Sequence, residues 1–214
     1  MPSPDSTWVL VPVKAFDRAK ERLSPSLSIP DRARIAARLG RGVVEASAPL
    51  PVAVACDDVL VARWAEALGA RVIWVEARGL NAAVSDGLAH LARRGIGRAI
   101  VAHGDLARPA GLARVHLDGY AEGNDVHPGV TLVPDLDRRG TNVMVTPTRP
   151  AIECSYGPGS FQRHLRLAAD LGLPVRVLDD PDLGFDVDLP SHLAALDAAP
   201  VPHRPAEPST PTHP

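Results

Sequence analysis

The sequence is poor in cysteine, and this shortage narrows the classes of protein to which it can belong. Its 214 residues include two cysteines, Cys56 and Cys154, which form no CxxC pair. The eight histidines show neither the HExxH spacing nor that of a zinc finger. These patterns exclude a disulfide framework and the common zinc motifs, so we expect a reducing, cytoplasmic location.

The sequence also lacks a surplus of one charge and a long apolar run. Its formal net charge is −2 and its pI about 6.4, a balance that argues against the broad basic surface of nucleic-acid-binding proteins. No apolar run approaches the roughly 20 residues that cross a bilayer, and the N-terminus lacks the pattern of a signal peptide. We therefore expect neither a nucleic-acid partner nor membrane attachment.

Apolar residues make up 45% of the chain, which is enough to form one hydrophobic core. They occur in segments that alternate between strand-like and helix-like patterns. The patterns predict strands over residues 8–13, 52–56, 71–75 and 98–102, and helices starting near 31 and over 59–68, 81–94 and 109–120. Such alternation is typical of a single α/β domain, in which a mostly parallel sheet carries helices on both faces.

Beyond residue 130 the pattern changes. Strand-like segments over 130–133, 141–146 and 151–153 follow one another before a helix over 160–171, which predicts a small mixed or antiparallel extension of the sheet. Residues 198–214 are rich in proline and have almost no large apolar side chains. We therefore expect a domain over 1–197 followed by a disordered tail.

Carboxylates stand where two strands are predicted to end, and ligands of open α/β sheets bind at that edge. Asp105 follows the strand over 98–102, while Asp186 and Asp188 lie two apart in a strand-like segment and would share a face. Neighbouring carboxylates repel unless a cation lies between them, which favours a metal site. An ordinary turn at Asp105 and a solvated acidic loop at the other two are the alternatives.

Two further groups of residues suit an anionic ligand. The loop after the first strand carries Lys14, Lys20 and Arg22, which can hold a triphosphate or simply be a solvated basic loop. The segment over 156–161 (YGPGSF) is a glycine-rich turn entering a helix, where backbone N–H groups and the Ser160 hydroxyl can bind an anion. Ser160 as a helix N-cap is the alternative.

Six motifs in this order resemble one family. They are PVKxFxxAKxRL at 12–23, GLNAAV at 79–84, GDL at 104–106, DxxRxGTN at 135–142, YGPGSFxxH at 156–164 and FDVD at 185–188. Together they resemble the guanylyltransferases of coenzyme F420 biosynthesis, which act on 2-phospho-L-lactate or phosphoenolpyruvate. The likeness spans about residues 8–197.

The resemblance implies a single-domain nucleotidyltransferase-like fold, of the GT-A or Rossmann-like kind, that transfers GMP from GTP to a small phosphorylated carboxylic acid. It implies that Asp105, Asp186 and Asp188 hold Mg²⁺, with Asp105 also counted among the catalytic residues. The residues implied for the phosphate of the acceptor are Thr141, Gly157 and Ser160. Those implied for GTP are Lys14, Lys20, Arg22 and Asn81, of which Lys14 and Arg22 would also act in catalysis.

The chain departs from the family pattern at two positions, because Ala107 replaces the usual proline after GDL and Leu189 replaces the usual threonine after the last aspartate. The sequence leaves the acceptor open between phosphoenolpyruvate, 2-phospholactate and 3-phosphoglycerate, and the assembly open between a monomer and a homodimer. Rival hypotheses are a transferase of the same fold acting on a molybdenum cofactor or a sugar phosphate, a glycosyltransferase, and a non-catalytic GTP-binding protein.

Overall fold

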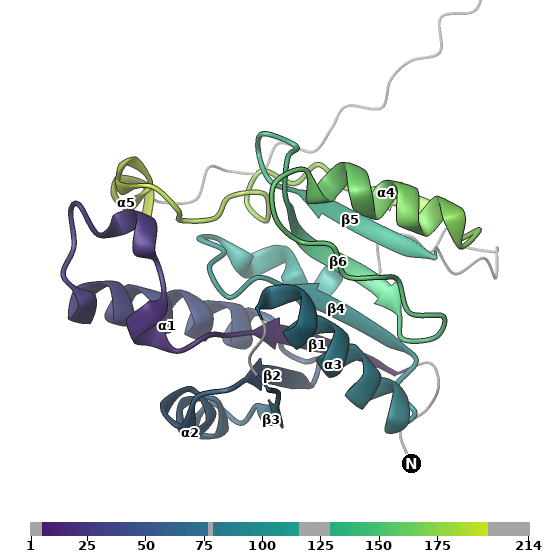
Figure 1. Ribbon diagram of the computed structural model, residues 1–214, viewed down its shortest axis with the longest axis horizontal. Helices are drawn as coiled ribbons and strands as arrows, with labels where there is room; N and C mark the ends of the chain where they lie inside the picture. Colours follow the sequence, from purple (N-terminus) through teal and green to yellow (C-terminus); the bar gives the residue numbers. More distant parts are fainter. Residues whose placement is uncertain (1–5, 77–78, 116–128, 197–214) are drawn as a thin grey trace, which may run out of the picture.

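The computed structural model describes residues 6–76, 79–115 and 129–196. Its strands form one seven-stranded sheet in the order β3-β2-β1-β4-β6-β5-β7 (Figure 1). Strands β1 to β4 run parallel, β6 is antiparallel to both β4 and β5, and β7 is parallel to β5. The strands are β1 Thr7–Pro12, β2 Val52–Cys56, β3 Arg71–Trp74, β4 Arg98–Ala102, β5 Val130–Pro134, β6 Thr141–Pro147 and β7 Val175–Val177.

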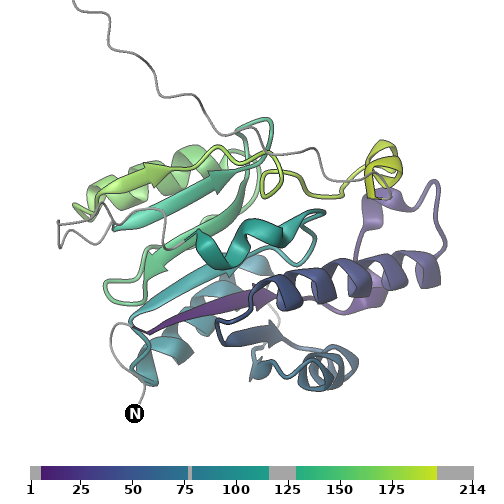
Figure 2. The same cartoon turned by 180° about the vertical axis from the view of Figure 1, so that it is seen from behind.

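Helices cover both faces of this sheet. Figure 1 shows α3 and α4 on the near face, and Figure 2 shows α1 and the 3₁₀ helix η3 on the other. The helices are α1 Ile29–Ala46, α2 Val59–Ala67, α3 Leu80–Arg93, α4 Ser160–Asp170 and α5 Leu193–Leu196, with 3₁₀ turns η1 Phe16–Arg18, η2 Glu21–Leu23, η3 Pro109–Arg114 and η4 Pro190–His192. None of the helices in the described part of the chain is both long and apolar enough to cross a membrane.

Strand β1 shows why the sheet needs cover on both sides. Leu10 belongs to the core under α3 and α4, whereas Val9 and Val11 belong to the core under α1 and α2, and all three are fully buried. Successive side chains of a strand point to opposite faces, so a parallel strand buried on both faces is apolar throughout. The expected α/β class, with its antiparallel portion, is confirmed.

Several expected elements differ from the structure. Residues 109–114 form a 3₁₀ helix rather than the start of a longer α-helix, and 116–128 lie outside the described residues. The strand expected over 151–153 is absent from the described residues, because β6 already pairs with β4 and β5 on its two sides. The short edge strand β7 was not predicted, since three partly buried residues with Arg176 in the middle give no apolar pattern. The tail expected over 198–214 also lies outside the described residues and stays a prediction.

Two helical glycines allow a matched test of the packing between helix and sheet. A Cβ added at Gly87 in α3 would lie 2.8 Å from both methyl groups of Leu10, whereas one at Gly42 in α1 would meet only Pro109, at 3.8 Å. We expect Gly87→Ala to lower the free energy of unfolding by about 1–3 kcal/mol through overpacking. Gly42→Ala should raise it by about 0.5–1 kcal/mol through helix propensity. Denaturant unfolding of both variants checks this, and equal effects would contradict it.

Candidate active site

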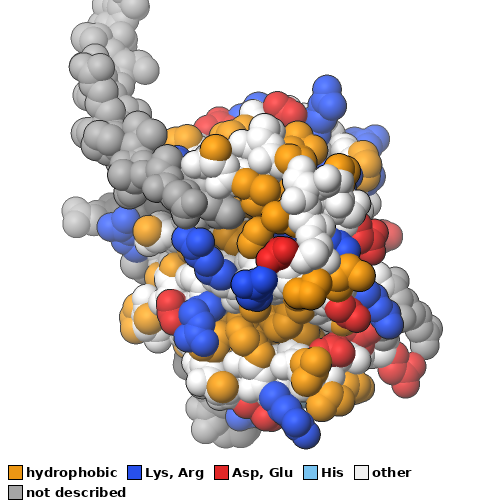
Figure 3. Space-filling model, turned by 90° about the vertical axis from the view of Figure 1, so that its left-hand side faces the viewer, with side chains coloured by type: hydrophobic (Ala, Val, Ile, Leu, Met, Phe, Trp, Pro, Cys, Tyr) orange, Lys and Arg blue, Asp and Glu red, His pale blue; other side chains and the backbone are white. Residues whose placement is uncertain are grey.

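A cavity of about 560 Å³ opens beyond the carboxyl ends of β1, β2 and β4. Figure 3 faces the side of the molecule where α1, α2 and α5 lie in Figure 1, and it shows Lys and Arg side chains around apolar and acidic ones. Five of the predicted site residues line this cavity, namely Lys14, Lys20, Arg22, Asp105 and Asp188. The volume is in the range of sites for nucleotide-sized ligands.

The basic loop after β1 is held in place by two contacts. Buried Arg32 on α1 donates a hydrogen bond from Nη1 to the carbonyl oxygen of Ala19, at 2.8 Å. The ring of Phe16 packs edge-on against Trp64 of α2, with centroids 5.2 Å apart. Lys20 follows Ala19 with its backbone in the left-handed region, φ 54°, and only 5% of its side chain is exposed.

Lys20 joins two of the three predicted metal ligands. Its Nζ lies 2.7 Å from Asp105 Oδ2 and 3.3 Å from Asp188 Oδ1. Arg22 reaches the other oxygen of Asp188, with Nη1 3.0 Å from Oδ2. Carboxylate oxygens of Asp105, Asp186 and Asp188 all lie within 4.8 Å of one another. The structure thus brings together three carboxylates that are up to 83 residues apart in the sequence (188 − 105).

The electrostatics of the three carboxylates suit a divalent cation. Burial, together with the charges of Asp105 and Asp188, raises the pKa of Asp186, and Lys20 offsets only part of this. Burial favours the neutral form of Asp105 too, but Lys20 and then His103 outweigh it and hold the pKa of Asp105 below its ordinary value. The buried Oδ1 of Asp105 has no hydrogen-bond partner among the described residues. A hard cation would satisfy that oxygen and relieve the repulsion, so these residues fit a metal.

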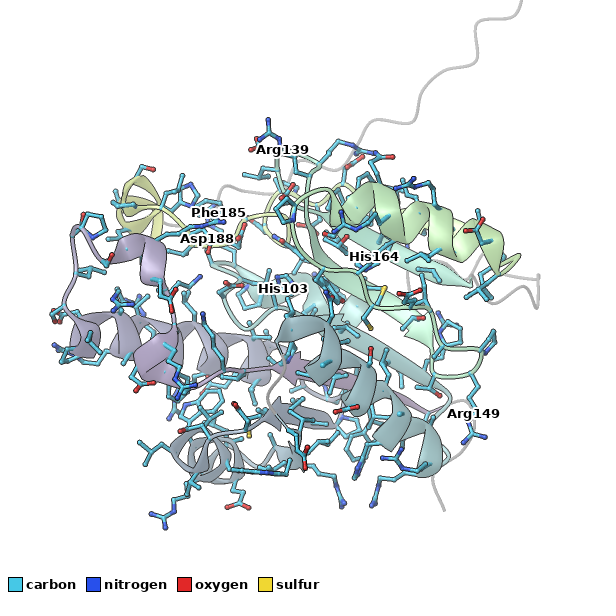
Figure 4. The ribbon with its side chains drawn as sticks, in the orientation of Figure 1. His103, Arg139, Arg149, His164, Phe185 and Asp188 are labelled. Carbon is cyan, nitrogen blue, oxygen red and sulfur yellow. The ribbon has the colours of Figure 1, made fainter. Side chains whose placement is uncertain are left out.

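The segment from Phe185 to Asp188 is not the strand that the sequence predicts. It makes a single antiparallel bridge between Leu106 and Asp186, flanked by backbone hydrogen bonds from Ala107 N–H to the Phe185 carbonyl at 3.0 Å and from Val187 N–H to the Asp105 carbonyl at 3.3 Å. This backbone pairing places Asp186 close to Asp105. The alternation of side chains along a regular strand is not what brings them together. Figure 4 shows Phe185 and Asp188 on this segment.

The glycine-rich turn before α4 is shaped by two glycines and an arginine. Gly157 and Gly159 have φ values of 113° and 76°, a region that favours glycine. Arg163 donates to the carbonyl oxygens of Ser155, at 2.8 Å, and Pro158, at 2.6 Å. Gly159 is the N-cap, and Ser160 is the first helical residue, 1% exposed, so the alternative of Ser160 as an N-cap is wrong.

The other five predicted site residues are not among those that line the cavity, namely Asn81, Thr141, Gly157, Ser160 and Asp186. Asn81 has a structural role, since its side chain donates to the Tyr156 carbonyl oxygen, at 3.3 Å, and accepts from the Tyr156 N–H, at 2.6 Å. It thereby ties the glycine-rich turn to the start of α3. The predicted nucleotide contact of Asn81 stays a prediction.

Sequence reasoning missed three residues near the site. His103 lines the cavity two residues before Asp105, and its ring centroid lies 5.2 Å from that of Tyr156. Asp57 follows β2 and lines the same cavity. Arg163 clamps the glycine-rich turn. Asp57 and His103 each come directly after a predicted strand, and this position could have identified both from the sequence. Nothing in the sequence marks the contacts of Arg163.

Comparison with known proteins assigns the chain to a family. Residues 7–197 match the family described as Guanylyl transferase CofC like. The chain belongs to this family. It is 36% identical over 199 residues to phosphoenolpyruvate guanylyltransferase of Rubrobacter xylanophilus, covering 91% of this chain and 95% of that relative. It is 30% identical over 204 residues to 2-phospho-L-lactate guanylyltransferase of Natrialba magadii, covering 88% and 82%.

Solved structures agree on the fold of this family member. The chain is similar to a nucleotidyl transferase from Methanothermobacter thermautotroptrophicus with a TM-score of 0.59, at 15% identity, over 89% of this chain and 95% of that one. At such low identity the likeness concerns the fold alone. It confirms the expected nucleotidyltransferase-like architecture, and the resemblance of the six motifs is confirmed by the family match.

Proposed function

We propose that the protein transfers GMP from GTP to the phosphate of phosphoenolpyruvate or 2-phospho-L-lactate, releasing pyrophosphate, in the biosynthesis of coenzyme F420. The observation that carries this proposal is the family match over residues 7–197, together with relatives that are named guanylyltransferases for these two acids. A molybdenum-cofactor or sugar-phosphate transferase is less favoured, because neither substrate occurs in the names of those two relatives.

The metal would be Mg²⁺, held by Asp105, Asp186 and Asp188. Support comes from the proximity of their oxygens, within 4.8 Å, and from the raised pKa of Asp186. Oxygen ligands of this kind are those that Mg²⁺ takes when it bridges protein and phosphate. When bound, the ion supplies positive charge that polarises the phosphoryl oxygens and helps to orient them.

The cations of the loop after β1 would bind the triphosphate. Lys14 is exposed and faces the cavity, and the Arg22 side chain is 72% exposed, so both can reach an entering anion. Positive charge placed beside the phosphates stabilises the charge that develops as pyrophosphate leaves. Lys20, which is held between Asp105 and Asp188, would add its charge beside the carboxylates.

The reaction requires the protein mainly to align the two substrates and to stabilise the negative charge that develops. An oxygen of the acceptor phosphate forms a bond to the α-phosphorus of GTP, and the bond from that phosphorus to the β-phosphate oxygen breaks. The acceptor phosphate is already anionic at neutral pH, so no proton has to be removed and no strong general base is needed. Catalysis then rests on alignment and on electrostatic stabilisation.

One experiment tests this function. GTP is mixed with phosphoenolpyruvate, 2-phospho-L-lactate or 3-phosphoglycerate in turn, and product and pyrophosphate are detected by mass spectrometry and by a coupled assay. We expect a GMP adduct with at least one of the three acids. Failure with all three, alongside intact binding of GTP, would refute the proposed function and favour a non-catalytic nucleotide-binding protein.

The acceptor side of the proposal predicts a specific effect of Ser160→Ala. The loss of a hydroxyl that binds a charged phosphate should weaken acceptor binding by about 1–3 kcal/mol. The measurement is the KM for the acceptor, with the KM for GTP as an internal reference and Ser26→Ala, on the exposed loop before α1, as control. An unchanged acceptor KM would remove Ser160 from the acceptor site.

A further inference from the structure

One carboxylate of the cavity stands apart from the acidic group. Asp57 directly follows β2, is partly buried and lines the cavity. Asp105 and Asp188 are both paired with Lys20, whereas the side chain of Asp57 makes no hydrogen bond and no ion pair within the described ranges of the chain. None of the steps proposed for the transfer uses Asp57.

The register of the sheet places Asp57 on the far side of β1 from the acidic group. Strands β2 and β4 flank β1. Continuing the parallel register of β1 with each of them puts Asp57 and Asp105 level with Lys14, one on either side. Neighbouring strands lie about 4.8 Å apart, so the two strand ends are separated by roughly 10 Å. Ribose and a purine ring together can span such a gap.

The phosphates of a nucleotide belong on the β4 side of this gap. Lys20 and Arg22 lie against Asp105 and Asp188, at 2.7 to 3.3 Å, so the cations and the carboxylates meet at one end of the cavity. A phosphate chain with its metal ion satisfies both kinds of charge there. The base of the same nucleotide is then directed toward the ends of β2 and β3.

The wall formed by the ends of β2 and β3 and the start of α3 suits a flat apolar ring. Ala55, Val75, Leu80 and Ala83 line the cavity there, and α3 packs against both β1 and β2 (Figure 1). Leu80 is 38% exposed although it is a large apolar side chain. A base that covers it would remove apolar surface from water, and Asp57 supplies a polar group at the same end.

The chemistry of a carboxylate distinguishes guanine from adenine. Guanine carries two adjacent donors, N1–H and the 2-amino group, and a carboxylate at neutral pH accepts hydrogen bonds and donates none. Its two oxygens can therefore take both donors at once. Adenine has no hydrogen on N1 and no 2-amino group, so its lone pair would face the carboxylate.

We propose that Asp57 selects the base of the nucleotide: its carboxylate accepts hydrogen bonds from N1–H and the 2-amino group of GTP, while the apolar wall at Leu80 covers the ring. This inference rests on the proposed function, which supplies GTP as the nucleotide, and it adds the residue that sets base specificity. The rival is a hydrogen bond from the ribose hydroxyls to Asp57, which would not depend on the base.

A series of nucleotides tests the wild type without any substitution. Isothermal titration calorimetry in the presence of Mg²⁺ gives the Kd of GTP, ITP, XTP and ATP. ITP lacks the 2-amino group and should bind about 10-fold more weakly than GTP. XTP, which has an oxygen in place of that group, and ATP should bind at least about 10²-fold more weakly. Equal affinities for GTP and ATP would overturn the inference.

Asp57→Asn tests the carboxylate itself. The amide can accept from N1–H and donate to the extra oxygen of XTP, so the preference for GTP over XTP should fall at least about 10²-fold. Asp57→Ala should lose affinity for GTP without gaining any for XTP. Glu21→Gln changes another carboxylate that lines the cavity, on the loop after β1, and should leave the preference unaltered.

The outcomes separate this inference from the proposed function. If no acid accepts GMP, the proposed function fails, and the binding series still decides the inference because it needs no acceptor. If Asp57→Asn weakens all four nucleotides by the same factor, Asp57 contacts the ribose and the inference is wrong while the function stands. A change of preference in Glu21→Gln in place of Asp57→Asn would also overturn it.

Discussion

Removal of divalent metal with EDTA is expected to abolish GMP transfer, and added Mg²⁺ is expected to restore it. Asp105, Asp186 and Asp188 bring their oxygens within 4.8 Å of one another, and the burial and charges around Asp186 raise its pKa. Without a divalent ion, the phosphates of two anionic substrates would have to approach this negative group. The loss of several kcal/mol of transition-state stabilisation corresponds to at least about 10³-fold in rate.

Pyrophosphate release measures the effect, with a heat-treated sample and a sample given equal amounts of EDTA and Mg²⁺ as controls. The melting temperature should rise on addition of Mg²⁺, because a ligand that binds the folded state stabilises it. Full activity in excess EDTA would contradict the metal assignment without touching the assignment of the fold.

Replacement of Asp188 by asparagine is expected to lower kcat by about 10²–10³-fold while the protein stays folded. The change removes one of the three carboxylates and also the partner of Lys20, at 3.3 Å, and of Arg22, at 3.0 Å. Lys20 keeps its shorter contact with Asp105, at 2.7 Å. Because Asp188 and Arg22 are substantially exposed, the change in unfolding free energy should stay below about 1 kcal/mol.

Steady-state kinetics and thermal unfolding of the same preparation separate these two effects. Asp170→Asn, at the exposed end of α4, carries the same chemical change away from the cavity and should leave kcat unaltered. Near-normal turnover of Asp188→Asn would show that the acidic group is structural. A large fall in stability would mean that Lys20 and Arg22 depend on Asp188 more than their exposure indicates.

The fold could be predicted from the sequence where a pattern is long and repeated. Apolar residues spaced one helical turn apart, Leu39 and Val43 on α1 and Val84 and Leu88 on α3, mark the buried faces of these helices, and all four are buried. Leu80 is an exception, because it stands one turn before Val84 on the same side of α3 and yet is 38% exposed and lines the cavity. Short elements such as β7 were missed because three residues give too little pattern, and their strand pairing is set by neighbours remote in sequence.

The site could be predicted only at the level of residue types. That Asp105 would follow a strand was readable, whereas Asp188 was expected within a strand that the structure replaces by a single bridge. The common partner of the two, Lys20, is 85 and 168 residues away from them. Arg32 holds the loop that carries Lys20 through its hydrogen bond to the Ala19 carbonyl oxygen, and no local pattern encodes that contact either. An extra residue in β6, Asn142, likewise shows only in the strand register.

The backbone bridge between Leu106 and Asp186 holds the short segment that carries two of the three carboxylates of the site. Residues 185–188 are attached by this bridge with its two flanking hydrogen bonds, by the fully buried side chain of Val187, and by the ion pairs of Asp188 with Lys20 and Arg22. A local opening of this segment would have to break all of these contacts. Any such excursion would carry away two carboxylates at once. An ion bound by all three carboxylates would oppose the excursion with the binding energy that Asp186 and Asp188 contribute, and residues 185–188 would become more rigid as the ion binds.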